Sequence, residues 1–188
     1  MMFKKFFIIL TLFLFSFSNY IKSKERSIMI MKLKYGEVKI ELFDDVAPNH
    51  VKRIKSLANS EKYDGVAFHR VIDGFMAQTG DVKFGNTKLD FNAQMVGTGG
   101  SDLPDLKAEF NNIPHQRGVL SMARSQSPDS ANSQFFICFD SHPHLDRNYT
   151  AFGRVISGME FVDKIKKGAP GSGVVDNPDI IISLRSAK

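Results

Sequence analysis

The sequence contains one cysteine, Cys138, among its 188 residues. A lone cysteine excludes an intramolecular disulfide, so the chain is not a small domain held together by disulfide bonds. Cys138 lies within the apolar segment SQFFICF, and we expect a buried thiol there rather than a nucleophile. The sequence also lacks an internal repeat and a second domain boundary, and its length suits one domain with a real core.

Positive charge is scarce once the first residues are set aside. The chain has a formal net charge of +5, and its first 23 residues hold Lys4, Lys5 and Lys22 but no acid, which leaves +2 for the remainder. That remainder has no stripe of Lys and Arg, so its charge does not support nucleic-acid binding. His142 and His144 are close in sequence but have no acidic or cysteine partner at ligand spacing, so we expect no metal and no cofactor.

Long apolar runs are also absent, except at the N-terminus. The basic start MMFKK leads into an apolar run from Phe6 to Ser18, which is the layout of a secretory signal. A membrane-spanning helix needs about 20 apolar residues, and this run is shorter. We therefore predict a signal peptide over residues 1–23, whose cleavage site the pattern does not fix, and a periplasmic or secreted protein with no stable membrane span. Two alternatives stay open: an uncleaved signal that tethers the protein to the membrane, and a cytoplasmic protein translated from Met29 or Met31.

Short strand-like segments dominate the rest of the chain. IMIMKLKYGEVKIELF predicts a hairpin turning at Tyr35 and Gly36, and further strands are expected in AFHRVI, GFMAQTG, GVLSMAR, SQFFICF, TAFGRVI and IIISLR. Apolar residues at helical spacing predict one helix from Pro48 to about Ser60 and a second from Met159 to Lys166. Many short strands with few helices are typical of a β-sandwich or barrel.

The segment FHRVIDGFMAQTGD, residues 68–81, places Arg70 among Phe68, Phe75 and Met76, with Gln78 further on. A guanidinium always carries its charge and rarely stands among aromatic side chains without a defined partner. The segment therefore indicates a polar group set into an apolar surface. The alternative is an arginine whose stem lies over a hydrophobic edge.

Side chains alternate between the two faces of a strand, which predicts how these segments are oriented. In SQFFICF, Phe135, Ile137 and Phe139 form the better core face, which leaves Gln134 and Phe136 on the other side.

The same alternation in FHRVI places Arg70 on one face with Phe68 and Ile72, and His69 on the opposite face. We interpret His69 as a core or edge histidine with satisfied hydrogen bonds rather than a catalytic base.

Four segments in order resemble the cyclophilin family of peptidyl-prolyl cis/trans isomerases, in its bacterial form. They are residues 68–81, GTGG at 97–100, GVLSMARSQSPDSANSQFFI from Gly118 and HLDRNYTAFGRV from His144, and the resemblance covers a domain at 28–188. It implies a mainly β fold, namely a closed eight-stranded antiparallel β-barrel capped by two α-helices. It also implies proline-containing polypeptide segments as substrates, no cofactor, and a monomer.

The resemblance assigns roles to individual residues. Such an enzyme accelerates rotation about an Xaa-Pro bond, and Arg70 matches the family residue that donates to the prolyl nitrogen of the twisted transition state. Gln78 matches the amide that supports this arginine and the substrate carbonyl, and Phe75 completes the expected catalytic set. Substrate binding is expected at Met76, Gly97, Ala123, Arg124, Gln134, Phe136, His144, Leu145 and Tyr149.

Among these residues, Phe75, Met76, Phe136 and Leu145 match the walls of the proline pocket, which apolar side chains suit best. The backbone of Ala123 and Arg124 matches the part that pairs with the bound peptide, alongside Gly97 in the adjoining loop.

Some positions depart from the better-known eukaryotic pattern. His144 stands where those members carry a tryptophan that helps bind cyclosporin, and Tyr149 stands at their pocket histidine. We therefore predict weak inhibition by cyclosporin. Arg124 and Ser125 replace small or amide residues, and the loop between Asp81 and Gly97 is enlarged without a role that the sequence assigns.

Two other functions compete with an isomerase. A proline-binding or chaperone module would use the same pocket, but binding a proline ring does not require the guanidinium of Arg70. A hydrolase or nuclease in the same barrel is disfavoured because the sequence suggests no paired carboxylates and no nucleophile with a base.

Overall fold

The computed structural model describes residues 26–187, so the predicted signal peptide lies outside the described residues. The elements in chain order are β1 (Ile28–Leu33), β2 (Gly36–Leu42), α1 (Pro48–Asn59), β3 (Arg70–Ile72), β4 (Met76–Thr79), β5 (Val119–Met122), β6 (Phe135–Cys138), a 3-10 helix (Pro143–Leu145), β7 (Ala151–Ser157), α2 (Met159–Val162) and β8 (Ser183–Ser186). Within residues 26–187 the eight strands form one sheet in the order β3-β4-β6-β5-β7-β2-β1-β8. Every neighbouring pair is antiparallel.

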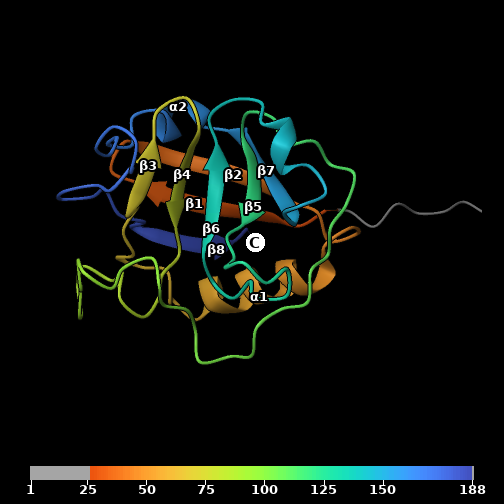
Figure 1. Ribbon diagram of the computed structural model, residues 1–188, viewed down its shortest axis with the longest axis horizontal. Coiled ribbons are helices and arrows are strands. Elements are labelled where there is room, and N and C mark those ends of the chain that lie inside the picture. The colour runs from red at the N-terminus through yellow and green to blue at the C-terminus, as the bar shows by residue number, and fades with distance from the viewer. Residues whose placement is uncertain (1–25, 188) are drawn as a thin grey trace, which may run out of the picture.

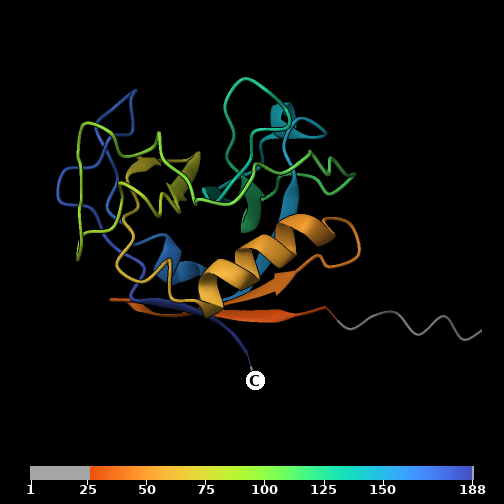
Figure 2. The ribbon, with the colours of Figure 1, turned by 90° about the horizontal axis from the view of Figure 1, so that it is seen from below.

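The sheet is strongly curled. Figure 2 shows β1 and β8 in a lower layer with α1 lying over it, while β3 and β4 lie on the far side of the molecule. The expected mainly β fold with antiparallel strands and two helices is confirmed.

The two end strands of the sheet, β3 and β8, do not form a ladder with each other in the described residues. The chain just before each of them makes the connection instead, through an isolated bridge between Ala67 and Ile180 and a hydrogen bond from the Phe68 amide to the Asp179 carbonyl, at 2.8 Å. The observed architecture is thus a curled half-barrel of eight strands, viewed along its short axis in Figure 1.

The first hairpin forms as predicted, with its turn one residue earlier than expected. Leu33 pairs with Gly36, so Lys34 and Tyr35 make the turn. Along both strands every second side chain is buried, which is the pattern of a sheet with one face on the core.

Helix α1 is confirmed and ends at Asn59. Pro48 occupies its first turn, where a missing N–H costs no helical hydrogen bond, and its apolar side chains are buried. Its N-cap residue gives no side-chain hydrogen bond, and the Glu109 carboxylate accepts from the amides of Asn49 and His50 instead, at 3.0–3.1 Å. This contact attaches the long segment after β4 to the helix.

Helix α2 is shorter than predicted, since it ends at Val162 rather than Lys166. The Lys166 amide donates to the Asp179 carboxylate at 2.9 Å, so it leaves the helical ladder for a partner near the C-terminus. Ile165 is nevertheless buried, which explains why its spacing resembled a continuing helix. No helix among residues 26–187 combines the length and apolar character needed to cross a membrane.

Candidate active site

Arg70 begins β3, and its side chain is partly buried. Its Nε donates to the carbonyl oxygen of Ser172 at 3.2 Å, which fixes the direction of the guanidinium. The two terminal nitrogens have no hydrogen-bond partner within residues 26–187, and the side chain lines a cavity with an apolar floor, which we call the apolar cavity. The arginine is therefore held at one nitrogen and free to donate with the others.

The apolar cavity has a volume of about 530 Å³ and is lined by Arg70, Phe75, Met76, Gln78, Ala123, Arg124, Phe136, His144, Leu145, Asn148 and Tyr149. Its floor is a cluster of buried side chains separate from the main core, made of Met76, Phe136, Cys138 and Leu145. Phe135, Ile137 and Phe139 belong to the main core. The predicted division of SQFFICF into two faces is thus confirmed.

The predicted division of FHRVI between two faces of a strand is confirmed only for the residues within β3. Ile72 packs against the cavity floor, but Phe68 is fully buried in the main core together with Val71. The prediction for Phe68 was wrong because β3 begins at Arg70, so strand alternation does not extend back to residue 68.

His69 is buried, but the prediction of satisfied hydrogen bonds was wrong. Neither ring nitrogen forms a hydrogen bond of good geometry within the described residues, although the Ala67 backbone and the Gln134 side chain lie close to the ring, and burial lowers the pKa of the imidazole. A Cβ on Gly97 would lie 3.3 Å from the His69 ring, so the ring packs directly under that glycine.

Aromatic rings form the rim of the apolar cavity. The Phe75 ring meets His142 edge-on at 4.7 Å between ring centroids, and it lies 5.9 Å from His144. Tyr149 meets Phe136 edge-on at 5.9 Å, and the Arg124 guanidinium carbon lies 4.5 Å from the centre of the Tyr149 ring. These contacts keep the rings in defined positions around the opening.

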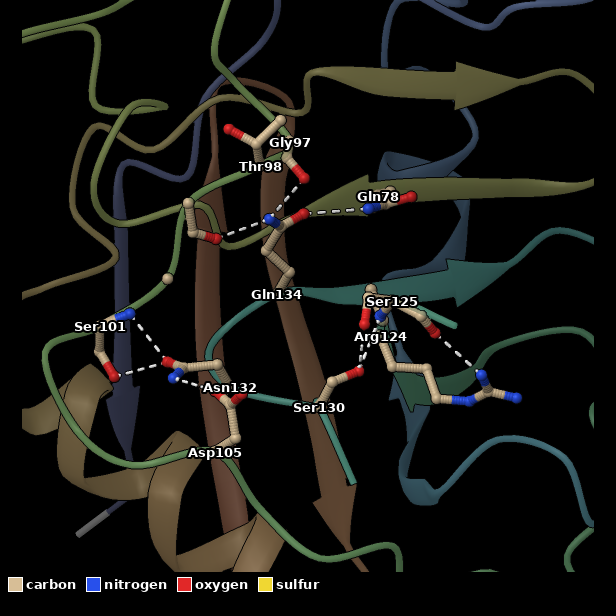
Figure 3. Close-up of a pocket in the computed structure, with 13 residues that line it drawn as sticks. Gln78, Gly97, Thr98, Ser101, Asp105, Arg124, Ser125, Ser130, Asn132 and Gln134 are labelled. Carbon is tan, nitrogen blue, oxygen red and sulfur yellow. Dashed lines mark hydrogen bonds between the residues drawn. The ribbon is translucent and has the colours of Figure 1, made fainter. Parts of the chain in front are cut away.

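Gln78 pairs across the strands with Arg70, yet its side chain does not bond to the arginine. Its amide nitrogen donates instead to the Gln134 side-chain oxygen at 3.0 Å, while the Gln134 amide nitrogen donates to the carbonyls of Gly97 and Gly99 at 2.9 and 2.8 Å (Figure 3). The expected direct support of Arg70 by Gln78 is therefore replaced in this structure by the Ser172 carbonyl.

A second, polar cavity of about 550 Å³ adjoins the first, since both are lined by Gln78, Ala123 and Arg124. Asn132 organises it by accepting from the Ser101 amide and hydroxyl and donating to the Asp105 carboxylate, at 2.7–2.9 Å (Figure 3). The Arg53 guanidinium on α1 bonds to the carbonyls of Asn132 and Pro104, so the helix holds the outer wall of this cavity.

Ala123 and Arg124 form a segment that lines both cavities, and one of their two backbone amides is free among the described residues. The Ala123 amide bonds to the Gln134 carbonyl at 3.0 Å, whereas the Arg124 amide has no partner among the described residues. The Arg124 side chain is bonded to the carbonyls of Asn148, Ser125 and Gln126. A peptide lying here would meet an available N–H at Arg124.

Sequence reasoning assigned no role to the segment GAPGSG, residues 168–173. The Gly173 carbonyl accepts from the Val71 amide at 2.7 Å, and Gly173 has φ of +74°. A Cβ there would approach Ile72 to 2.4 Å, so glycine permits the close packing that brings the Ser172 carbonyl to Arg70. The density of glycines was the only available signal.

The structure also assembles a serine, histidine and aspartate that the sequence did not suggest. His115 Nδ1 lies 2.9 Å from the Asp146 carboxylate, and Nε2 lies 2.9 Å from the Ser121 hydroxyl. The premise that no nucleophile stands beside a base was therefore wrong. Ser121 and His115 have exposed fractions of 0% and 1%, so no substrate reaches them, and hydrolysis is still disfavoured.

This group supports the apolar cavity from behind. The His115 ring stacks on Phe136 at 6.3 Å between centroids, and Asp146 follows Leu145 in the chain. Burial lowers the pKa of His115, and the His115 amide lowers the pKa of Asp146 by donating to its carboxylate. Cys138 is fully buried as predicted, and burial raises the pKa of its thiol to about 12.

The chain is similar in sequence to known proteins of one family. The family described as cyclophilin type peptidyl-prolyl cis-trans isomerase/CLD matches residues 28–186. A probable peptidyl-prolyl cis-trans isomerase of Brucella suis is 61% identical over 155 residues, covering 82% of this chain and 79% of that protein. A peptidyl-prolyl cis-trans isomerase of Helicobacter pylori is 39% identical, covering 80% and 87%.

Among solved structures, a cyclophilin-type isomerase of Cryptosporidium parvum, determined in the presence of the dipeptide Ala-Pro, superposes with a TM-score of 0.73. It is 28% identical, and the match covers 86% of this chain and 99% of that one.

Proposed function

Because the chain belongs to the cyclophilin-type peptidyl-prolyl cis-trans isomerase family and catalyses rotation about Xaa-Pro bonds, we propose that the apolar cavity is its active site and that Arg70 is the catalytic donor. One observation carries this proposal. Arg70 presents a charged group with unpartnered terminal nitrogens to a cavity whose floor is otherwise apolar.

The chemistry required is stabilisation of a twisted amide. Uncatalysed rotation faces a barrier of about 20 kcal/mol and takes tens of seconds. At the transition state the resonance is lost and a lone pair is localised on the prolyl nitrogen. A donor aimed at this nitrogen stabilises the twisted state more than the planar one, which is the condition for acceleration. Isomerisation in milliseconds requires about 10⁴-fold acceleration, or about 5 to 6 kcal/mol.

The cavity floor suits a proline ring. Met76, Phe136 and Leu145 offer apolar surface, and a prolyl residue brings no N–H that would need an acceptor there. Burying the three ring methylenes would contribute about 2 kcal/mol to binding. Phe75 and Tyr149 would close the sides of the ring.

The polypeptide on either side of the proline would follow the segment between the cavities. The Arg124 amide is available to pair with the peptide backbone, and the polar cavity beyond it would receive the chain before the proline. His144 stands at the exposed rim, where it would contact the chain after the proline.

The proposal is tested with residues 24–188 and a short Xaa-Pro peptide whose isomerisation is followed directly. Arg70→Ala is expected to reduce kcat/KM by about 10²- to 10³-fold, the usual cost of removing one transition-state donor. Arg70→Lys restores the charge without the forked geometry and should recover only part of the activity.

The same variants separate an isomerase from a proline-binding module. If catalysis depends on Arg70, the alanine variant should still bind a proline peptide while losing turnover. Equal rates for wild type and Arg70→Ala would refute the mechanism.

We also propose that a signal peptide at residues 1–23 directs export to the periplasm and is then cleaved. The mature protein would act there as a monomer, and its curled sheet would close into a barrel. Support for export comes from the basic start and the short apolar run. The N-terminal sequence of the mature protein distinguishes cleavage from tethering and from translation at Met29 or Met31.

A further inference from the structure

We propose that Asp81 is a positioning residue for substrate binding, because its carboxylate holds the backbone at the edge of both cavities and separates the enlarged loop from the site. This inference rests on the proposed function. It concerns a residue that does not line either cavity.

The Asp81 side chain is fully buried and accepts four backbone hydrogen bonds. Oδ1 accepts from the amides of Lys83 and Phe84 at 3.1 and 2.9 Å, and Oδ2 accepts from the amides of Gly97 and Gly99 at 2.7 and 2.9 Å. No Lys or Arg within residues 26–187 forms an ion pair with it. Backbone amides therefore provide the stabilisation that a buried carboxylate requires.

These bonds fix the segment from Gly97 to Gly99 from one side, and Gln134 fixes it from the other. The Gln134 amide nitrogen donates to the carbonyls of both glycines, and Figure 3 shows the bond to Gly97. A Cβ on Gly99 would lie 2.5 Å from Asp81 Oδ1, so the close approach requires glycine at that position. The backbone here is clamped between a charge and an amide.

Further contacts connect the Gly97–Gly99 segment to the apolar cavity. Gln134 accepts from Gln78, and Gln78 lies opposite Arg70 in the pairing of β3 with β4. Gln78 and Gln134 both line the polar cavity, and Gln78 also lines the apolar one. The path from Asp81 therefore runs through the backbone of Gly97 and Gly99 and then through the side chains of Gln134 and Gln78, and the backbone pairing of β3 with β4 connects it to Arg70.

The two carboxylate oxygens also close the base of the enlarged loop. Oδ1 binds the chain where the loop leaves β4, and Oδ2 binds it where the loop returns at Gly97. Between these points the loop has exposed side chains, including Leu89, Phe91 and Met95. Because one residue holds both ends of the loop, the length and movements of the chain between them need not disturb the two cavities.

The test compares Asp81→Asn with Asp90→Asn in the protein comprising residues 24–188. Both replacements remove one negative charge from the same loop, but Asp90 is exposed and forms no side-chain hydrogen bond among the described residues. Asp81→Asn places an NH₂ group against two of the four amides. We expect KM for an Xaa-Pro peptide to rise about tenfold in Asp81→Asn, with kcat within about threefold of wild type, and no change in Asp90→Asn.

A purely structural role would lower the fraction of folded enzyme, which reduces kcat and leaves KM unchanged, so that result overturns the inference. An unchanged KM and kcat overturns it as well. If the wild type does not isomerise the peptide, the proposed function fails, and hydrogen exchange decides the role of Asp81 separately.

Hydrogen exchange in the wild type also covers the case in which Asp81→Asn does not fold. Gly97 is exposed and Gly99 half-exposed, and both lie in a loop. Their amide hydrogens should nevertheless exchange with solvent at rates near those of strand amides. Rapid exchange at both glycines contradicts the clamp.

Discussion

The apolar and polar cavities meet at Gln78, Ala123 and Arg124 but are built in different ways. Strand residues of β4 and β6 form much of the apolar floor, and packing among themselves and with Leu145 holds them. Loops form most of the polar cavity, and hydrogen bonds through Asn132, Gln134 and Asp81 hold them. A proline ring has one shape and needs a rigid apolar site, whereas neighbouring residues vary and suit a polar surface on loops.

Each cavity also has a buried histidine behind it, and the two histidines differ. His115 lies behind Phe136, and both of its nitrogens have partners. His69 lies behind Gly97, and neither nitrogen has a hydrogen bond of good geometry in the described part of the chain. The two rings therefore differ in how they are held, since well-formed hydrogen bonds fix His115 whereas packing positions His69.

The largest effect is expected from removing the floor of the apolar cavity. Phe136→Ala should lower the free energy of unfolding by about 3 kcal/mol, since the ring is buried, and should also reduce kcat/KM. Phe135→Ala is the matched control, because it makes the same change on the opposite face of β6. It should destabilise the fold to a similar degree while the folded enzyme keeps its activity. Chemical denaturation and the peptide assay at low temperature measure both, and equal activity losses would contradict the division of faces.

The two histidines should differ in their contribution to stability. His115→Leu leaves the buried Ser121 hydroxyl without this partner and should lower the free energy of unfolding by about 2 kcal/mol. His69→Leu removes no hydrogen bond of good geometry, so its cost should be below about 1 kcal/mol. Denaturation midpoints check this difference, and a larger loss at His69 would show that its ring has a partner that geometry does not reveal.

Acid should destabilise the protein before its carboxylates titrate. Burial lowers the pKa of His50, His69 and His115 in the folded state, so the unfolded chain binds protons first as pH falls. The stabilisation is therefore complete above the unfolded value of about 6.5 and is lost as pH falls below it. We expect a lower urea midpoint at about pH 5.5 than at about pH 7.5, with a smaller drop in His115→Leu. A midpoint independent of pH across this range would contradict the assignment.

In the polar cavity, a substitution should act only on longer substrates. Asn132→Ala removes the bonds that join Ser101 and Asp105, so it should raise KM about threefold for a peptide that extends several residues before the proline. A peptide that begins one residue before the proline should be unaffected. A comparison of the two peptides with wild type and variant tests this, and an equal effect on both would place Asn132 outside a separate binding region.

The smallest effect is expected from cyclosporin. His144 and Tyr149 stand where the better-known eukaryotic members carry tryptophan and histidine, and His144 lies at the exposed rim of the apolar cavity. We expect weak inhibition of the peptide assay, tightened by His144→Trp. Nanomolar inhibition of the unmodified domain would contradict the prediction.

Local pattern was sufficient for the elements whose own residues decide their structure. Helix α1 was predicted within one residue because Pro48 and its apolar spacing both mark it, and the first hairpin and the two faces of β6 followed from strict alternation. Helix α2 was predicted too long: the Ile165 amide bonds to the Val162 carbonyl only three residues back, and the Lys166 amide bonds to Asp179, thirteen residues later in the chain. Pattern does not report such a distant competitor.

The functional site likewise has some features that the local sequence predicts and others that it does not. The sequence alone determined the family, the isomerase activity and the presence of Arg70 among apolar residues, since these depend on residue types at fixed spacing. Only the tertiary structure decided that Ser172 rather than Gln78 holds the arginine and that a single buried carboxylate, Asp81, joins both ends of the enlarged loop. The reason is physical: hydrogen bonds to backbone groups do not depend on the identity of the residue that provides them, so they leave almost no trace in the sequence.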